Sequence, residues 1–321
     1  MIAALLTSAA LALGASAAPL PILGFQSAGS PTALIARDAG GLGSVGVAGV
    51  DLTGPAGRAS APSTADRAQL AAAHAAGRPG VLLVGNYSNR IGDFSEPLAW
   101  HTLRSRAATA RLARTLAGEA HAERWDGISV DLESLRPRDA PGLVRFLADL
   151  RSDLGPSASL TDCVQNRTTL GAYRAAGYHL AGIARSVSQV VLMAYDQHGP
   201  WERTPGPVAA DRWVRGGLRA LLGTIPPAQV DLGVGGYGYV WARSGRRRWM
   251  VSDAGARALV ARRGGHARWV RSVGEWTARL PGGATIWWSD ARTLAVREAL
   301  ARRLGLHGLA VWSLGLSDPI G

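Results

Sequence analysis

The sequence predicts an α/β fold, a closed (β/α)₈ TIM barrel, from three observations. Eight short apolar segments occur along the chain, separated by segments whose apolar residues have helical spacing. The apolar segments lack polar/apolar alternation, which indicates parallel strands covered on both faces. The 321 residues also provide the length that eight strand–helix units need. An open doubly wound sheet is the alternative. No G-x-G-x-x-G opens the first helix and no P-loop occurs, which disfavours nucleotide binding.

The elements follow in order. The predicted strands span residues 22–25, 45–50, 81–84, 125–133, 158–162, 189–195, 229–236 and 309–312. The predicted helices span residues 31–38, 66–76, 98–121, 143–154, 208–222, 254–262 and 290–304, with one more inside 170–183. Residues 53–66 are rich in Gly, Pro, Ser and Ala and predict a loop. Residues 241–286 exceed a simple crossover and predict a small inserted lobe before the last strand.

The N-terminus resembles a secretory signal. Residues 1–17 are apolar and end in Ala15-Ser16-Ala17, so cleavage is expected before Ala18, leaving residues 18–321 as the barrel. The segment lacks a basic residue, so a misassigned start or a retained anchor are alternatives. No other apolar run is long enough to span a bilayer, so we expect no stable membrane insertion. The expected location is secreted, extracellular or in the cell wall.

Composition narrows the functional classes. All 35 basic residues are arginine and the net charge is +12, which favours anionic partners. The arginines are scattered and no nucleic-acid motif accompanies them, so we expect no nucleic-acid partner. Cys163 is the only cysteine, which excludes an internal disulfide and a cysteine-based metal site. The histidines show neither H-x-H nor H-E-x-x-H spacing, so no metal and no cofactor are expected. We expect a monomer.

The strand at 125–133 carries the strongest site signal. Side chains alternate along a strand, so Ser129, Asp131 and Glu133 share one face. Two carboxylates on one face of a buried strand are costly unless they have a partner or a function. Such pairs are typical of acid–base sites, where one carboxyl stays protonated beside an ionised one. The alternative is a strand end whose acids are solvated or cap the next helix.

Polar and aromatic residues also follow other predicted strands. In a barrel, catalytic groups lie at the C-terminal ends of the strands. Tyr195 and Asp196 end the sixth strand and Trp312 ends the eighth, while Asn86 and Tyr87 follow the third as candidate substrate contacts. These ends should converge on one mouth.

Four segments together resemble glycoside hydrolase family 18, the chitinase family, most closely its bacterial spore and cell-wall hydrolase branch. They match the signature D-G-x-D-x-D-x-E, the segment M-x-Y-D, a last strand ending G-x-x-x-W-S-L-G and W-x-x-D-A-R. In this chain they start at Asp126, Met193, Gly308 and Trp287, and they span most of the mature chain.

The resemblance implies retaining hydrolysis of a β-1,4 bond beside N-acetylglucosamine, in chitin or peptidoglycan. Glu133 would be the general acid, its pKa raised by burial beside Asp131. Asp131 would orient the acetamido group, which itself attacks the anomeric carbon, because this family uses no enzyme nucleophile. Tyr195 would donate to the acetamido oxygen with Asp196 alongside, and Trp312 would form the floor under the sugar. Asp126 and Ser129 belong to the signature and are further candidate substrate contacts.

One position departs from the family pattern: Ser129 stands where the signature has its middle Asp. Without that charge, the pKa of Asp131 should fall rather than rise. Two other functional classes therefore stay open. The chain could be a non-catalytic glycan-binding barrel, or an unrelated barrel enzyme whose D-x-E pair binds a metal. The intact Glu133 favours the glycosidase.

Overall fold

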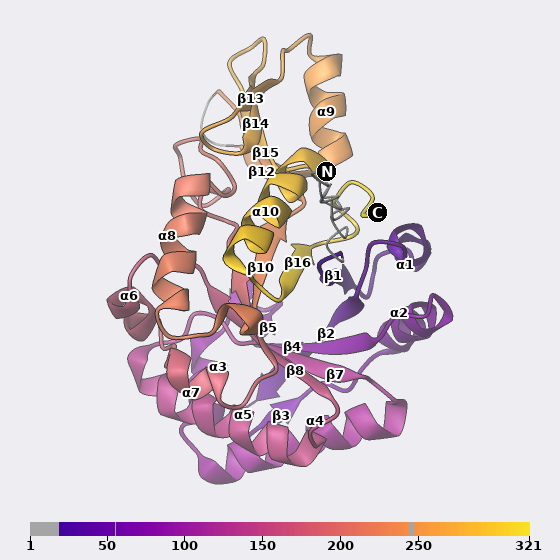
Figure 1. Cartoon of the computed structure of the whole chain (residues 1–321), viewed down its shortest axis with the longest axis vertical. Helices are drawn as coiled ribbons and strands as arrows, with labels where there is room; N and C mark the ends of the chain where they lie inside the picture. The colour runs from indigo at the N-terminus through magenta and orange to yellow at the C-terminus, as the bar shows by residue number, and fades with distance from the viewer. Residues whose placement is uncertain (1–18, 55, 244–246) are drawn as a thin grey trace, which may run out of the picture.

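The computed structural model describes residues 19–54, 56–243 and 247–321 (Figure 1). The expected signal segment, residues 1–17, lies outside them. Eight parallel strands close into a barrel, because β1 pairs with both β16 and β2. In spatial order they are β1 (Ile22–Ser27), β2 (Ser44–Gly54), β4 (Gly80–Gly85), β7 (Gly127–Asp131), β8 (Ser159–Gln165), β9 (Gln189–Met193), β10 (Val230–Gly235) and β16 (Gly308–Trp312). The predicted (β/α)₈ barrel is confirmed and the open sheet is excluded.

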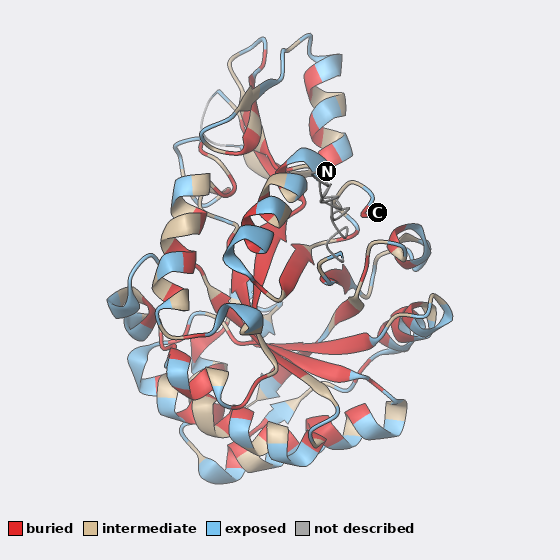
Figure 2. Ribbon diagram, viewed as in Figure 1, coloured by how far each residue is buried: buried red, intermediate tan, exposed pale blue. Residues whose placement is uncertain are grey.

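Helices surround the barrel, each with an exposed outer face, while the strands are buried (Figure 2). The α-helices outside the lobe are α1 (Ala33–Asp38), α2 (Thr64–Ala75), α3 (Glu96–Leu103), α4 (Arg106–Glu123), α5 (Ala140–Leu154), α6 (Leu170–Ala175), α7 (Leu180–Ala184), α8 (Asp211–Leu222) and α10 (Ala291–Leu304). Two short 3₁₀ turns are η1 (Pro137–Asp139) and η2 (Pro227–Gln229). Among the described helices, none is both long and apolar enough to cross a bilayer.

Strand alternation divides the core into two layers. Ile128 and Val130 of β7, and Leu132 just after it, face the helices and join the large cluster between barrel and helices. The barrel interior holds a smaller cluster that includes Phe25, Leu83, Cys163, Val191 and Met193. Tyr195 and Trp312 pack on this inner cluster, so these two predicted site residues lie directly above the apolar interior of the barrel.

Two predicted element boundaries were wrong, and helix capping explains both. The helix expected at 98–121 is two helices, because the Ser105 hydroxyl caps a new start by accepting from the Ala108 amide at 3.3 Å. The loop expected at 53–66 contains β3 (Arg58–Ala59) and the start of α2, where Ser63 and Asp66 form a capping box. After β4 a small hairpin, β5 (Tyr87–Ser88) and β6 (Asp93–Phe94), stands at the barrel mouth.

The insertion is a lobe that projects from one side of the barrel, in orange in Figure 1. Its antiparallel sheet has the order β12 (Arg248–Ser252), β11 (Tyr237–Trp241), β15 (Thr285–Trp288), β14 (Glu275–Arg279) and β13 (Arg268–Val270), with α9 (Asp253–Arg262) on one face. The lobe therefore spans residues 237–288, wider than the predicted 241–286. Trp249, Trp269 and Trp276 do lie in it, and Trp249 and Trp276 pack against the cluster under α9.

A buried carboxyl joins the lobe to the segment that follows β9. Glu275 is fully buried and accepts hydrogen bonds from the Val208 and Ala209 amides at 2.8 and 2.6 Å. Arg297 of α10, 1% exposed, donates to Asp211 at 2.7 Å and to the Ala209 carbonyl. These contacts hold the lobe beside the barrel mouth.

Candidate active site

The acidic and aromatic residues predicted from strand ends meet at one mouth of the barrel. Asp131 ends β7 and Glu133 follows it by two residues. Tyr195 and Asp196 follow the end of β9, and Trp312 is the last residue of β16. Because the barrel strands are parallel, all five lie at the C-terminal end.

The backbone of Glu133 is held by Asn86, which follows β4. The Asn86 amide nitrogen donates to the Glu133 carbonyl at 3.0 Å, and the Glu133 amide donates back to Asn86 Oδ1 at 2.9 Å. Asn86 also donates to the Ser95 carbonyl and is fully buried. The prediction that Asn86 contacts substrate is therefore wrong; it positions Glu133 instead.

The Glu133 side chain is half-buried and poised to titrate near neutrality. Burial raises its pKa to about 7, the hydrogen bond that Gln165 donates to it opposes this rise, and the charge of Asp196 adds to it. Arg167 donates in turn to Gln165 and lowers the Glu133 pKa slightly. Gln165 is not among the predicted site residues because the predicted fifth strand ends at residue 162. The strand runs to Gln165, which makes that residue a strand-end side chain like the others.

Asp131 is 6% exposed, and its Oδ1 has no hydrogen-bond partner among the described residues. Burial raises its pKa well above the usual range, and the nearby charges of Glu133, Asp162 and Asp51 add to this. The prediction that the pKa of Asp131 falls is therefore wrong. Although position 129 carries no charge, desolvation of the buried Asp131 carboxyl raises its pKa. Asp51 lies in register with Gly85 and Asp131 across β2, β4 and β7, with only a glycine between the two carboxyls.

Ser129 lies inside the barrel rather than in the cleft. It is fully buried, its hydroxyl accepts from Thr161 Oγ1 at 2.8 Å, and Cys163 Sγ lies 3.6 Å away. Substrate cannot reach it, so the prediction of a substrate contact at Ser129 is wrong. The reason is its place on the strand, one layer below Asp131.

A pair of lobe tyrosines fixes Asp196. The hydroxyls of Tyr237 and Tyr239 both donate to Asp196 Oδ1, at 2.5 and 2.7 Å. Burial raises the pKa of Asp196 and these two bonds oppose the rise. Burial also raises the pKa of Tyr195 well above its usual range, so its hydroxyl stays a donor. The alternation of Tyr237, Tyr239 and Trp241 indicates a strand with one aromatic face, but the predicted lobe begins only at residue 241.

Aromatic rings line the mouth. Trp312 is half-buried above the inner cluster, with its ring centroid 5.6 Å from that of Phe25, and the peptide bond after it is cis. Trp213 of α8 borders a pocket of about 110 Å³ that also includes Glu133, Gln165 and Tyr195. Tyr87 is exposed on the β5–β6 hairpin, where it is open to a ligand.

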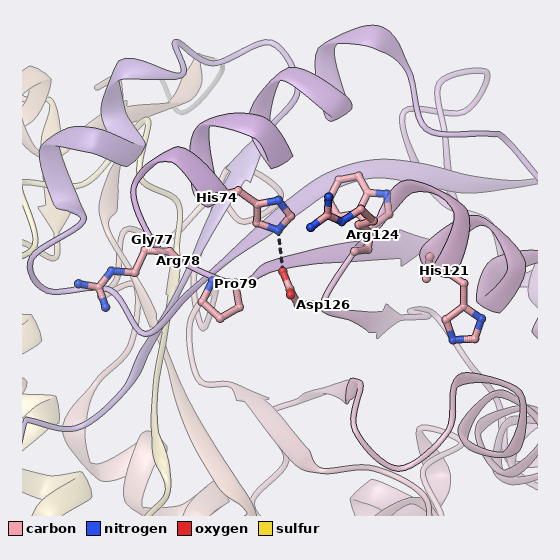
Figure 3. Close-up of a pocket in the computed structure, with 9 residues that line it drawn as sticks. His74, Gly77, Arg78, Pro79, His121, Arg124 and Asp126 are labelled. Carbon is pink, nitrogen blue, oxygen red and sulfur yellow. Dashed lines mark hydrogen bonds and ion pairs between the residues drawn. The ribbon is translucent and has the colours of Figure 1, made fainter.

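Asp126 lies at the opposite end of the barrel, so it does not join this cluster. It precedes the first residue of β7, whereas Asp131 ends that strand. Its carboxylate bonds to His74 at 2.8 Å and to the Gly80 amide at 2.7 Å, in a separate pocket of about 590 Å³ from which Arg78 points away (Figure 3). The prediction that Asp126 binds substrate is wrong, because five residues of extended strand separate the two ends.

The mouth combines the parts that acid-assisted cleavage of a sugar bond requires. A carboxyl with a pKa of about 7 can give up a proton at neutral pH. The buried carboxyl of Asp131, the hydroxyl of Tyr195 and the indole of Trp312 lie at the same end of the barrel. Within the described residues, no three His, Cys, Asp or Glu side chains gather in a geometry that could hold a metal ion.

Comparisons with known proteins agree with the barrel fold. The chain is 23% identical over 248 residues to an uncharacterised glycosylase of Bacillus subtilis, YvbX, covering 73% of this chain and 70% of the relative. It is 26% identical over 265 residues to the cortical fragment-lytic enzyme of B. subtilis, covering 74% of this chain but only 57% of that enzyme. The crystal structure of a chitinase from Chromobacterium violaceum superposes with a TM-score of 0.84 at 24% identity, covering 93% and 95% of the two chains, which shows the shared fold.

The family assignment rests on a match to a family model. Residues 74–316 match the model of the glycosyl hydrolases family 18, which is more than half of the chain. The protein is a glycoside hydrolase, and the chain belongs to glycosyl hydrolase family 18.

Proposed function

We propose that the protein cleaves β-1,4 linkages next to N-acetylglucosamine, in chitin or peptidoglycan, by substrate-assisted retention. Glu133 protonates the leaving oxygen. The acetamido oxygen of the sugar attacks the anomeric carbon from the face opposite the leaving oxygen, and the glycosidic bond breaks. Water, which gives a proton back to the ionised Glu133, then attacks from the face that the leaving oxygen has vacated and opens the oxazolinium ion. Each step inverts the anomeric carbon, so the two together give the product the configuration of the substrate.

The other residues act on the acetamido group and the sugar ring. The acetamido N–H donates to Asp131, and the positive charge that develops on the ring favours the ionised form of Asp131. Tyr195 donates its hydroxyl to the acetamido oxygen, and Asp196 lies beside it on the lobe tyrosines. The apolar face of Trp312 packs under the sugar at the cleavage point.

The observation that carries this proposal is the state of Glu133. Its pKa of about 7 suits a general acid at neutral pH. Asn86 holds its backbone through hydrogen bonds, and Gln165 donates a hydrogen bond to its carboxyl. An acid of ordinary pKa would be almost entirely ionised at neutral pH. The raised pKa of Asp131 also suits a carboxyl that becomes ionised only when positive charge forms beside it.

The test compares wild type with Glu133→Gln on fluorophore-labelled β-1,4-N-acetylglucosamine oligomers and on purified peptidoglycan. Loss of the acid should lower kcat about 10²–10⁴-fold. The matched control is Asp126→Asn, which neutralises the carboxylate at the other end of the same strand and should keep activity. NMR of the first product should show the β anomer. Equal rates for wild type and Glu133→Gln, or an α product, would reject the mechanism.

The relatives support a site of action at the bacterial surface. One curated relative is named a cortical fragment-lytic enzyme, so it acts on a wall polymer. By analogy, we propose that this protein acts on extracellular or cell-wall glycans after export. Fractionation of the native host, with detection of the protein in the medium, wall and cytoplasm, tests this.

A non-catalytic glycan-binding barrel is the second candidate, and the surroundings of Asp131 favour it. The residue below Asp131 is Ser129 rather than a second carboxyl, and Asp131 Oδ1 is unpartnered within the described chain. Binding of oligomers without hydrolysis, unchanged in Glu133→Gln, would support this candidate.

A further inference from the structure

The lobe carries a second hollow, which we call the lobe groove. It has a volume of about 780 Å³ and is lined by His266, Arg268, Arg279 and Trp287, among others. None of the described residues that line it is acidic. The aliphatic part of the Arg243 side chain lies against Gly283, which lines the groove. The lobe groove is therefore a basic surface with one aromatic ring.

The register of the lobe sheet connects this groove to the active site. Arg268 lies opposite Thr277, Thr277 opposite Trp287, and Trp287 opposite Tyr239. Directly opposed residues of antiparallel strands share a face, so these four form one row. The row covers three strand spacings, about 14 Å. It begins at Tyr239, whose hydroxyl binds Asp196.

The two arginines that line the lobe groove, Arg268 and Arg279, are free to bind a ligand. Arg268 and Arg279 are exposed, and neither side chain has a hydrogen bond or ion pair with another described residue. On β14, Thr277 and Arg279 are two residues apart, so Arg279 points to the same side as the row. Guanidinium groups bind carboxylates with paired hydrogen bonds, and Trp287 offers a flat face to a sugar. Trp287 also packs on the aromatic cluster that contacts Tyr195 and Trp312.

We infer that the lobe groove binds carboxylate groups of a glycan strand whose cleavage point lies at Glu133. The inference rests on the proposed function and names its substrate. Chitin carries no carboxylate. Peptidoglycan carries one on the lactyl ether of each muramic acid, either free or linked to a peptide that itself ends in carboxylates. The groove thus makes the enzyme select peptidoglycan over chitin.

The test uses full-length protein with the Glu133→Gln substitution, so that bound polymer is not degraded. Binding is measured to three insoluble polymers: native peptidoglycan, peptidoglycan whose carboxylates have been converted to methylamides, and chitin. A fourth sample, peptidoglycan freed of peptides, leaves only lactyl carboxylates. Each is compared for the parent, for Arg268→Gln/Arg279→Gln, and for the control Arg262→Gln/Arg303→Gln, which removes two exposed charges outside the groove.

The parent and the control should bind native peptidoglycan about tenfold more tightly than the methylamide form, and the groove variant should lose this preference. High salt should weaken it, since the arginines are exposed. If peptide-free strands keep the preference, the lactyl carboxylate is the ligand; if they lose it, the peptide carboxylates are. No preference in the parent, or an equal preference in the groove variant, overturns the inference. Hydrolysis of neutral oligomers by wild type would uphold the proposed function in either case.

Discussion

Asn86 and Glu133 exchange two hydrogen bonds between the ends of neighbouring strands, at 3.0 and 2.9 Å. This pairing fixes the backbone of the proposed acid rather than its carboxyl. The direction of the Glu133 side chain therefore depends on a buried side chain that substrate never touches. A general acid gains from such restraint because misplacement of about 1 Å costs much of its effect.

Replacing Asn86 should separate positioning from binding. Asn86→Ala leaves the amide and carbonyl of Glu133 without these partners, so the free energy of unfolding should fall by about 1–3 kcal/mol. Measured well below the melting temperature, kcat should fall about 10–100-fold with little change in KM. Asn89→Ala, an exposed asparagine on the same loop, is the control. A variant that is less stable but has wild-type kcat would show that Asn86 is merely structural.

Gln165 should set the alkaline limit of activity. Its amide stabilises the ionised form of Glu133, so its loss raises the pKa of Glu133 above about 7. Activity requires the protonated acid and is lost as pH rises through that value. Gln165→Leu should therefore move the alkaline limb of kcat/KM to higher pH, and Gln165→Glu should move it further by adding negative charge. If the alkaline limb of the kcat/KM profile lies at the same pH in wild type and in both variants, Gln165 does not have this role.

Asp131 should cost the protein stability at neutral pH. Its pKa in the folded state lies above its unfolded value, so the folded protein binds more protons than the unfolded chain. Its contribution to stability therefore falls as pH rises from about 4 towards the folded pKa. Asp131→Asn should raise the melting temperature at pH 8 more than at pH 4, while kcat falls. The control is Asp153→Asn on the exposed side of α5. Equal changes at both pH values would show that Asp131 is ionised in the folded state.

The barrel was predictable because its signals are local. Each strand is a short apolar run, and the rule that strand ends share one mouth brought Asp131, Glu133, Tyr195, Asp196 and Trp312 together. The signature does not by itself show which of its residues reach the barrel mouth, because they lie at different heights along the strand. Asp126 and Ser129 belong to the same nine-residue stretch as Glu133, yet one lies at the far end of the strand and the other inside the barrel.

The remaining site residues depend on contacts between distant segments. Gln165 required the end of β8 to be placed within three residues, which apolar patterning cannot do. Tyr237 and Tyr239 reach Asp196 only because the lobe lies beside the mouth. Asn86 has the position expected of a substrate contact, and only its burial shows that it serves the backbone of Glu133.

Restoring the family residue at position 129 tests whether this barrel interior can accept a second charge. Ser129 is surrounded by Thr161 and Cys163, with Leu83 opposite it on β4. An aspartate here would be buried below Asp131, and each carboxyl would raise the pKa of the other. Ser129→Asp should therefore be less stable than wild type, increasingly so as pH rises, and its pH–rate profile should differ from that of wild type.

The neutral variant Ser129→Asn separates charge from size. It should lose a similar amount of stability at pH 5, because its amide also lacks partners, but the loss should not grow with pH. Thermal melts of the three proteins from pH 5 to pH 9 provide the measurement. Parallel stability curves for the Asp and Asn variants would mean that the buried carboxyl at position 129 never ionises. In that case Ser129 would replace the family aspartate without electrostatic consequence for Asp131.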